Sequence, residues 1–448
     1  MLSDNKDIKE KRTAGEAGWR LSRYNLMAPL PGTDRIGIAN LFRATFSDYD
    51  PGEVYLLTEA ESLPEDHPIL GRFRERGLIV DFDEQQAMRD MGKSFRDTAD
   101  TVTLTICTTM RCNFDCPYCF ELHSGVDMSD AVQDDVAALA ERMIKTFHPK
   151  KLHVIWFGGE PLLAPDVIWS LTKKLQSLTD SCKVAYTAGI ITNGYLLTQE
   201  IADRLAQNGI RYGIIALDGV GDAHDRSRHL RGGGGTFERI TDNIRSIRIP
   251  FPVSIRHVIT GTNLDQIGSL QEFTQKLSAE SGNRLCYAPD ACGWNNATDA
   301  RGADVRLLEG DTAAEIGLLR DKYRFTAARG GYCGGCSIGS VDIDSKGRLY
   351  KCWPEMDNLK GRSFGNAKDW DPADPVRTAD DPLQLTGYLD TAVGDNDPEC
   401  MECIWLPLCA GGCPYYRVNI GKSCLPYRDM PEKFIQTLYE RMTEENRA

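Results

Sequence analysis

The distribution of cysteine is the feature of this sequence that most constrains its fold. The chain has 448 residues and 15 cysteines. A long chain whose N-terminus carries no apolar signal favours metal-binding or catalytic cysteines over a disulfide framework. Three cysteines lie between residues 112 and 119, and eight more crowd residues 333–424. We expect the other four to be small buried hydrophobic residues: Cys107, Cys182, Cys286 and Cys292.

Composition excludes several classes of protein. The formal charge of −13 argues against a general nucleic-acid binder, which needs a basic face. No run of about 18 uninterrupted apolar residues is present, so we expect no membrane span. The first residues, MLSDNKDIKEKR, are polar, which predicts a cytoplasmic protein. A chain of this length usually folds around more than one core, so two or three domains are expected.

Alternating strand and helix patterns between Thr101 and Pro289 predict an α/β fold. Ser129 is a candidate N-cap for a helix whose apolar residues recur every three or four positions. Apolar strands separated by such helices are typical of a parallel sheet covered by helices. The strands are expected at residues 101–106, 152–157, 184–191, 212–217 and 253–259.

The first cysteine group follows directly after the first of these strands. Cys112, Cys116 and Cys119 have the spacing C-x3-C-x2-C. Parallel sheets build their sites at the carboxyl ends of strands. Three thiolates so close can ligate three irons of a 4Fe–4S cluster and leave the fourth iron open. Half of a zinc site is the alternative, but Gly158-Gly159-Glu160-Pro161 after the next strand favours the cluster.

With both motifs present, the chain resembles the radical S-adenosylmethionine (SAM) superfamily. The resemblance implies a partial (β/α)6 TIM-like barrel, with Cys112, Cys116 and Cys119 holding a catalytic cluster. It also implies that SAM binds the open iron and is cleaved to a 5′-deoxyadenosyl radical. The residues that it places around SAM are Tyr118, Gly158, Gly159, Glu160, Pro161, Thr192, Asn193, Asp218, Arg228, Arg256 and Val258. His224 is expected to be a structural hydrogen-bonding residue.

The later cysteines resemble the SPASM domain that follows radical SAM barrels in peptide maturases. The chain matches its pattern, C-x(9–15)-G-x4-C, then C-x2-C-x5-C-x3-C and a further C, from Cys336 onward. The resemblance implies two auxiliary 4Fe–4S clusters, and thus three clusters in all. Structural zinc sites are the alternative. The implied ligands are Cys333, Cys336, Cys352 and Cys413 for the first auxiliary cluster, and Cys400, Cys403, Cys409 and Cys424 for the second. Without Cys333, the first would keep an open iron.

Residues 1–95 are expected to form a separate module. Extended segments at 24–27 and 35–38 precede an expected helix at Pro68–Arg76 and a strand at 77–80. The order resembles the winged-helix-like module with which related enzymes grip the leader of a precursor peptide by strand addition. A cap on the barrel edge is the alternative. The polar segment 83–100 is expected to be a linker.

The expected domains are thus the leader-recognition module (1–95), the radical SAM barrel (96–310) and the SPASM domain (311–448). Within the last of these, helices are expected at residues 311–328 and 431–445.

The resemblances together imply a radical SAM oxidoreductase that modifies a ribosomally synthesised peptide (a RiPP maturase). The preferred product is a thioether of ranthipeptide or sactipeptide type; C–C or C–O cross-linking and epimerisation are alternatives. An anaerobic sulfatase-maturing enzyme ranks lower, because that family typically has Asp after the cysteine matching Cys352, where this chain has Trp353. A non-enzymatic Fe–S electron carrier is disfavoured by the intact C-x3-C-x2-C motif. The expected partners are a precursor peptide with a leader and an external reductant such as flavodoxin or ferredoxin.

Overall fold

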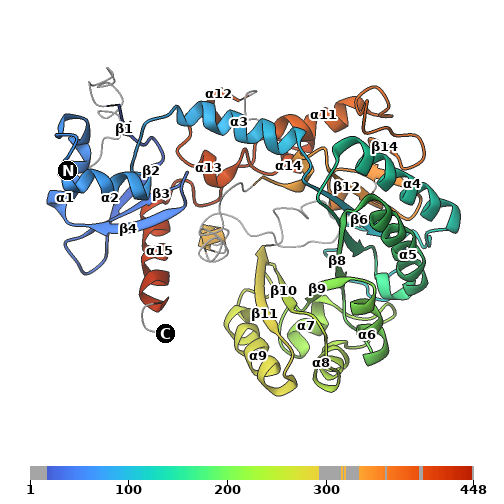
Figure 1. The fold of residues 1–448 in the computed structure, drawn as a ribbon. Coiled ribbons are helices and arrows are strands. Elements are labelled where there is room, and N and C mark those ends of the chain that lie inside the picture. Colours follow the sequence, from blue (N-terminus) through green and yellow to red (C-terminus); the bar gives the residue numbers. More distant parts are fainter. Residues whose placement is uncertain are drawn as a thin grey trace.

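The computed structural model describes residues 18–291, 314–315, 317–318, 332–358, 361–392 and 397–445. The described parts form an arch, with a small sheet and the helix α15 (Pro431–Glu445) at one end and a large sheet at the other (Figure 1). The helix expected at 311–328 lies outside the described residues except for four positions. Within the described part of the chain, no helix has the length and apolar character needed to cross a membrane.

A nine-stranded sheet forms the centre of the fold, in the order β11-β10-β9-β8-β7-β6-β12-β13-β14. Its strands from β6 to β11 are all parallel, which confirms the expected α/β class. They span Thr101–Cys107 (β6), Lys151–Phe157 (β7), Ala185–Thr192 (β8), Ile210–Ala216 (β9), Val253–Ile259 (β10) and Leu285–Ala291 (β11). The connecting helices are α4 (Asp130–Phe147), α5 (Pro165–Cys182), α6 (Gln199–Gln207), α7 (Asp222–Ser227), α8 (Phe237–Ser246) and α9 (Gln266–Ser281).

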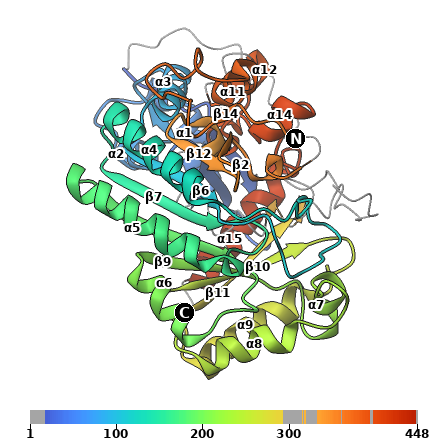
Figure 2. The same ribbon diagram turned by 90° about the vertical axis from the view of Figure 1, so that its right-hand side faces the viewer.

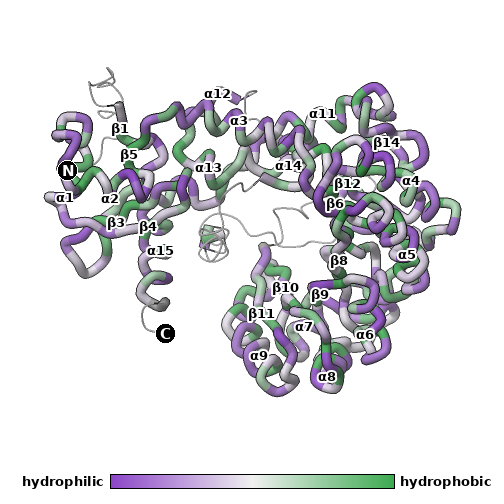
Figure 3. Tube along the Cα trace, viewed as in Figure 1, coloured by the Kyte–Doolittle hydropathy of each residue, from purple (hydrophilic) through white to green (hydrophobic). Residues whose placement is uncertain are grey.

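The helices cover the sheet because each has an apolar stripe. Helix α4 begins after Ser129, whose side chain accepts a hydrogen bond from the Val132 N–H, as the sequence predicts. Its buried residues include Val136, Leu139 and Met143. Helices α4 and α5 run beside strands β6 and β7 (Figure 2), and the tube of each helix alternates between hydrophobic and hydrophilic colours (Figure 3).

The C-terminal region extends the same sheet. Strand β12 (Ser340–Ile343) pairs in parallel with β6, so that Asp342 lies opposite Thr105. Strands β13 (Arg348–Tyr350) and β14 (Gly365–Asn366) follow with antiparallel pairing. The cysteine-rich region is therefore fixed to the strand that leads into the first cysteine group. Its short helices are η5 (Gly334–Cys336), η6 (Trp353–Glu355), α11 (Pro382–Thr391), α12 (Pro398–Glu402), α13 (Leu406–Cys409) and α14 (Pro414–Asn419).

The N-terminal residues form a second, antiparallel sheet of three strands, β2 (Asn25–Pro29), β3 (Ile36–Asn40) and β4 (Thr45–Tyr49). The short helix η2 (Ala60–Ser62) and helices α1 (Pro51–Thr58) and α2 (Pro68–Arg76) follow, and β5 (Ile79–Val80) pairs with β1 (Arg20–Leu21). Helix α2 has the predicted bounds. It ends at Gly77, whose φ of 73° is the left-handed conformation that glycine adopts without strain.

The segment expected to be a linker is a helix, α3 (Glu84–Asp97). Asp83 caps this helix by accepting hydrogen bonds from the N–H groups of Gln85 and Gln86, at 2.9 and 3.0 Å. The buried face is narrow: it includes Met88 and Gly92, where a Cβ atom would lie 2.2 Å from a backbone oxygen. So few apolar residues give a weak sequence pattern, although the N-cap is a recognisable signal.

The N-terminal sheet and helix α15 share one hydrophobic cluster. Leu26 of β2 belongs to it together with Phe434 and Ile435 of α15. The Phe434 ring stacks on Tyr427, with ring centroids 5.7 Å apart, and meets Trp405 edge-on at 5.2 Å. Segments from both ends of the described chain therefore depend on one core.

Candidate active site

The first cysteine group lies on the loop that follows β6. Cys116 is buried, and Cys112 and Cys119 pack against the main hydrophobic core. Burial is the main cause that raises the pKa of the Cys112 and Cys119 thiols, and the charge of Cys116 raises both further. Thiols in such surroundings stay protonated unless a metal binds the thiolate. The three sulfur atoms are thus close neighbours in a site that suits an iron cluster.

The Gly-Gly-Glu segment after β7 lies against this loop. The Gly159 N–H donates to the Thr109 carbonyl at 3.1 Å, and the Glu160 N–H donates to the Arg111 carbonyl at 2.8 Å. A Cβ atom on Gly159 would lie 2.3 Å from the Arg111 oxygen, and Gly158 adopts a φ of 128°. Both glycines are required because the two backbones touch.

The Glu160 side chain ties the ends of β7 and β8 together. Its carboxylate accepts hydrogen bonds from the Leu162 N–H at 3.0 Å and from the Thr192 hydroxyl at 2.6 Å. It also accepts from the Asn193 N–H at 2.7 Å. Burial raises the pKa of Glu160, although these donors oppose the shift. Asn193 in turn donates to the side-chain oxygen of Asn113 in the cysteine loop, at 2.8 Å.

A second group of polar side chains connects the cysteine loop to β9 and β10. The Tyr118 hydroxyl donates to Asp218, and it accepts from Arg228. The Arg228 guanidinium lies 3.7 Å from the Asp218 carboxylate, which also accepts from the Val258 N–H at 3.2 Å. Arg256 pairs with Asp290 at 2.5 Å.

Two buried polar atoms beside the loop, Arg228 Nε and Asn113 Nδ2, have no hydrogen-bond partner within the described ranges. Unpaired buried donors are costly, so this site suits a polar cofactor that bears acceptor atoms.

His224 has the structural role that the sequence predicts. Its Nδ1 accepts from the Asp218 N–H at 3.2 Å, and its Nε2 lies 3.0 Å from the Thr236 hydroxyl. Burial, aided by the charge of Arg228, lowers the pKa of His224 to about 3. The imidazole is therefore neutral and occupied by two neighbours.

Residues 106–274 match the sequence family described as the Radical SAM superfamily. This part of the chain is a radical SAM domain. The match supports an enzyme that uses SAM and a 4Fe–4S cluster, and it covers the cysteine loop, the Gly-Gly-Glu segment and Arg228.

Curated relatives of the chain include two proteins named for haem chemistry. A pre-heme d1 synthase from Dinoroseobacter shibae is 32% identical over 36% of this chain and 37% of its own length. An AdoMet-dependent heme synthase from Methanosarcina barkeri is 24% identical over 68% of this chain and 88% of its own length.

Among solved structures, native anSMEcpe with bound AdoMet and Kp18Cys peptide has a TM-score of 0.60 at 17% identity. The match covers 78% of the present chain and 100% of the anSMEcpe chain. At this identity the likeness establishes the shared fold alone.

A cavity of about 750 Å³ lies between the radical SAM domain and the C-terminal region. All three radical SAM cysteines line it, and so do Cys333 and Cys352. Of the residues implied around SAM, Gly158, Gly159, Glu160, Thr192, Asn193, Arg228, Arg256, Val258 and Tyr118 line the same cavity. Pro161 and Asp218 are not among its lining residues; Asp218 acts through Tyr118.

Sequence reasoning missed several residues of this cavity, chiefly Asp342 and Lys351. Burial raises the pKa of Asp342 to about 6 and lowers that of Lys351 to about 8. The Lys351 ammonium donates to the carbonyls of Ser337 and Ser340, at 2.6 and 2.5 Å. Asp342 reaches the cavity because β12 pairs with β6, a non-local contact without a local sequence signal.

The first C-terminal cysteine set gathers Cys333, Cys336, Cys352 and Cys413. Burial is the largest cause that raises the thiol pKa of Cys333, Cys336 and Cys352, and the charge of Cys413 raises each of them further. Cys413 comes from the start of α14, far along the chain from the other three. Cys333 thus lies near Cys336, Cys352 and Cys413.

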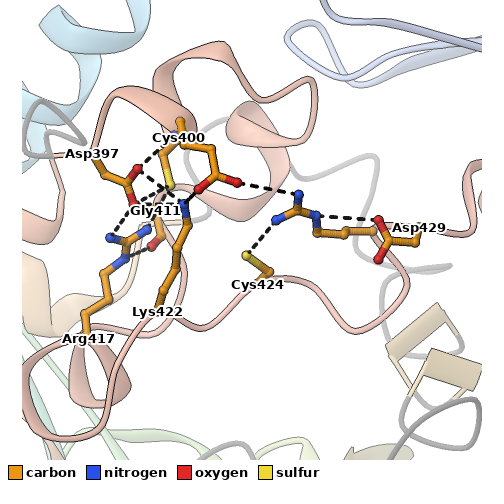
Figure 4. Close-up of polar contacts among 9 residues, drawn as sticks. Asp397, Cys400, Gly411, Arg417, Lys422, Cys424 and Asp429 are labelled. Carbon is orange, nitrogen blue, oxygen red and sulfur yellow. Dashed lines mark hydrogen bonds and ion pairs between the residues drawn. The ribbon is translucent and has the colours of Figure 1, made fainter. Parts of the chain in front are cut away.

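The second set gathers Cys400, Cys403, Cys409 and Cys424 around a smaller cavity of about 240 Å³. Burial raises the pKa of the Cys409 thiol to about 12, and the charges of Cys424, Cys400 and Cys403 contribute. Figure 4 shows Cys400 and Cys424 facing positively charged side chains.

Across the described residues, no three His, Cys, Asp or Glu side chains converge as ligands of a single metal ion. A 4Fe–4S cluster binds each thiolate through a different iron, which requires wider spacing.

Proposed function

We propose that this chain is a radical SAM peptide maturase with two auxiliary clusters that forms a thioether in a ribosomally made peptide. The observation that supports this most is the shared cavity. The radical SAM cysteines and two cysteines of the first C-terminal set, Cys333 and Cys352, line one space of about 750 Å³. A substrate there would lie next to a site that removes hydrogen atoms and a site that accepts electrons.

In this proposal, Cys112, Cys116 and Cys119 hold the SAM-binding cluster. When bound, the cluster and SAM supply hydrogen-atom abstraction, a chemistry that side chains alone do not provide. The close contact of Gly158 and Gly159 with the backbone at Thr109 and Arg111 holds the cysteine loop in place. Asn193 and Thr192 fix the Glu160 carboxylate through hydrogen bonds. Arg228 has an unpaired buried Nε with which to meet the carboxylate of SAM.

Both apolar and polar residues line the cavity. Apolar residues of the parallel strands include Ile155, Ile191 and Ile214. They exclude water, which protects a reactive centre from side reactions. Thr103 and Ser340 also line the cavity, and their hydroxyl groups can bond the backbone of a peptide.

The likeness to the structure of anSMEcpe with a bound Kp18Cys peptide supports a peptide substrate here. The N-terminal sheet supports a leader as well, because β4 is an edge strand whose only partner in the described sheet is β3. An extended peptide can add to such an edge. Hydrogen exchange with and without the precursor tests this. Protection of residues 45–49 is expected, and unchanged exchange there would reject leader binding at β4.

The cavity wall favours a cross-link over formylglycine formation. Trp353 follows Cys352, stacks on Phe157 at 5.1 Å between ring centroids, and donates to the Thr105 hydroxyl at 3.2 Å. An indole N–H only donates hydrogen bonds. Trp353 therefore lacks the proton-accepting ability of the aspartate typical of sulfatase-maturing enzymes.

A tetrapyrrole-modifying enzyme is the second candidate. The relative named AdoMet-dependent heme synthase is matched over 88% of its length, which includes more than the radical SAM domain. Haem-type substrates would lie against the apolar residues of this cavity, and the experiment below separates the two candidates.

The deciding experiment incubates the anaerobically reconstituted chain with SAM, a reductant and the short peptide encoded beside its gene. The readout is the mass spectrum of the peptide after thiol alkylation. Loss of two hydrogens together with one alkylatable cysteine establishes a thioether, whereas loss of two hydrogens with all thiols intact indicates a C–C or C–O link. The matched control is Cys112→Ala, which should abolish SAM cleavage.

If the peptide is unchanged and an added iron porphyrin is converted instead, the tetrapyrrole alternative replaces the proposal. SAM cleavage that persists in Cys112→Ala contradicts the assignment of the site.

A further inference from the structure

Two arginine side chains donate hydrogen bonds to sulfur atoms of the second cysteine set (Figure 4). Arg417 Nη2 lies 2.9 Å from Cys400 Sγ, and Arg428 Nη1 lies 3.2 Å from Cys424 Sγ. Two of the four sulfur atoms in this set thus face a permanent positive charge at hydrogen-bond distance.

The Arg417 side chain is fixed in this position. Its Nη1 pairs with Asp397 at 3.3 Å, and its Nε donates to the Gly411 carbonyl. Asp397 is in turn bound by Lys422 at 3.0 Å and accepts from the Cys400 N–H at 3.2 Å. Two contacts, with Asp397 and with the Gly411 carbonyl, therefore hold the guanidinium against Cys400.

Arg417 also connects the two cysteine sets. It lies on α14, which begins directly after Cys413, and its N–H donates to the Cys413 carbonyl at 3.1 Å. Cys413 belongs to the first set, whereas Cys400 belongs to the second. One residue thus joins the backbone of one set to a sulfur atom of the other.

The surroundings of the first set have a different charge. The carboxylates of Asp342 and Glu355 lie close enough to Cys352 to raise its thiol pKa, although burial is the largest cause. The buried Lys351 ammonium lies near Cys333 and Cys336, and its own hydrogen bonds go to the Ser337 and Ser340 carbonyls. The first set thus combines carboxylates with one lysine. The second set has two guanidinium groups at hydrogen-bond distance from sulfur, and one carboxylate, Asp397, 3.4 Å from Cys400 Sγ.

We propose that Arg417 and Arg428 are positioning residues that raise the reduction potential of the second auxiliary cluster above that of the first. Net charge and hydrogen bonds to sulfur are the main protein contributions to such potentials, and positive donors stabilise the reduced, more negative state. The inference rests on the proposed function, which supplies the two clusters. With this order of potentials, transfer of one electron from the reduced first cluster to the oxidised second cluster is favourable, and an external one-electron carrier then takes it up.

The test is an anaerobic redox titration of the reconstituted full chain, followed by electron paramagnetic resonance. The signal that disappears in a Cys403→Ala/Cys409→Ala double variant identifies the second cluster. In the unmodified chain the second cluster should be reduced at a higher potential than the first. Arg417→Gln and Arg428→Gln should each shift the second cluster to a lower potential, and Arg417→Lys, which retains the charge, should shift it less. Arg377→Gln, an exposed arginine paired with Asp374, is the control and should cause no shift.

Iron and zinc analysis of each variant distinguishes the absence of the second cluster from the absence of an arginine effect on its potential. Zinc in the second set would refute the auxiliary cluster itself. A full complement of about 12 irons with an unchanged potential in both glutamine variants would refute only the role of the arginines, as would a second cluster with the lower potential in the unmodified chain. If Arg417→Gln loses iron, Arg428→Gln and Arg417→Lys decide the matter.

Discussion

The carboxylate of Glu160 accepts a hydrogen bond from the backbone N–H of Asn193, 2.7 Å away and directly after the next strand of the sheet, β8. Because Asn193 also donates to Asn113 in the cysteine loop, the contact links three consecutive segments of the radical SAM domain. The Gly-Gly-Glu-Pro motif thus shapes the candidate cofactor site.

Replacement of Glu160 by Gln should weaken both the fold and SAM binding. A neutral amide cannot accept from all three donors, so at least one buried N–H or hydroxyl loses its partner, at a cost of about 1–3 kcal/mol. We expect a lower free energy of unfolding and an affinity for SAM at least about tenfold lower, measured by chemical unfolding and by titration calorimetry. Glu141→Gln is the control, since its side chain is half exposed and pairs with Lys145. Equal behaviour of the two variants would contradict the role given to Glu160.

A methyl group at Gly159 should displace the cysteine loop. The added Cβ would lie 2.3 Å from the Arg111 oxygen and 3.0 Å from the Cys112 nitrogen. Gly159→Ala should therefore lower the iron bound at the three-cysteine site and the rate of SAM cleavage. Gly71→Ala provides the comparison, because its helical position has no atom within 4 Å of the added Cβ. Full iron content in Gly159→Ala would contradict the prediction, because it would show that the cysteine loop accommodates the added methyl group without losing the cluster.

The shared core at the ends of the chain should make Phe434 important for stability. Its ring is buried and contacts both Trp405 and Tyr427. Phe434→Ala should cost about 3–5 kcal/mol and reduce iron retention in the second cysteine set, because Trp405 also lines that cavity. Thermal unfolding and iron analysis measure these effects. An unchanged melting temperature would mean that α15 contributes little to the core.

The stability of the chain should depend on pH through His224. Burial lowers the pKa of this imidazole from 6.5 to about 3. Between these values the unfolded chain binds a proton that the folded chain excludes, so the free energy of unfolding falls as the pH decreases below 6.5. His224→Gln should make this fall less steep, by up to about 1.4 kcal/mol per pH unit, in urea unfolding of the apoprotein. Parallel pH profiles for the two proteins would contradict the buried neutral histidine.

Regular elements with strong local signals could be predicted from the sequence. The Ser129 cap, the bounds of α2 and α15, and the parallel strands all follow from caps and apolar periodicity. Helix α3 was missed because its buried stripe is narrow. The pairing of β12 with β6 joins residues far apart in sequence, and no local pattern specifies such a partner.

The same division applies to the candidate site. The grouping of the C-terminal thiols, with Cys413 in one set and Cys409 in the other, is what the resemblance to the SPASM domain implies. The resemblance to the radical SAM superfamily implied part of the cavity lining, including Glu160 and Arg228, but not the rest. Asp342 and Lys351 reach it through strand pairing and burial, which a sequence of ordinary composition does not reveal.

The contact between the N-terminal sheet and α15 has a consequence for synthesis. Leu26 leaves the ribosome long before Ile435, its partner in the same cluster. At ~5–20 residues per second, the roughly 400 intervening residues require about 20–80 s. During that time the radical SAM barrel can form while the buried face of the small sheet stays uncovered, so a nascent chain that stalls before α15 should be a preferred client of chaperones.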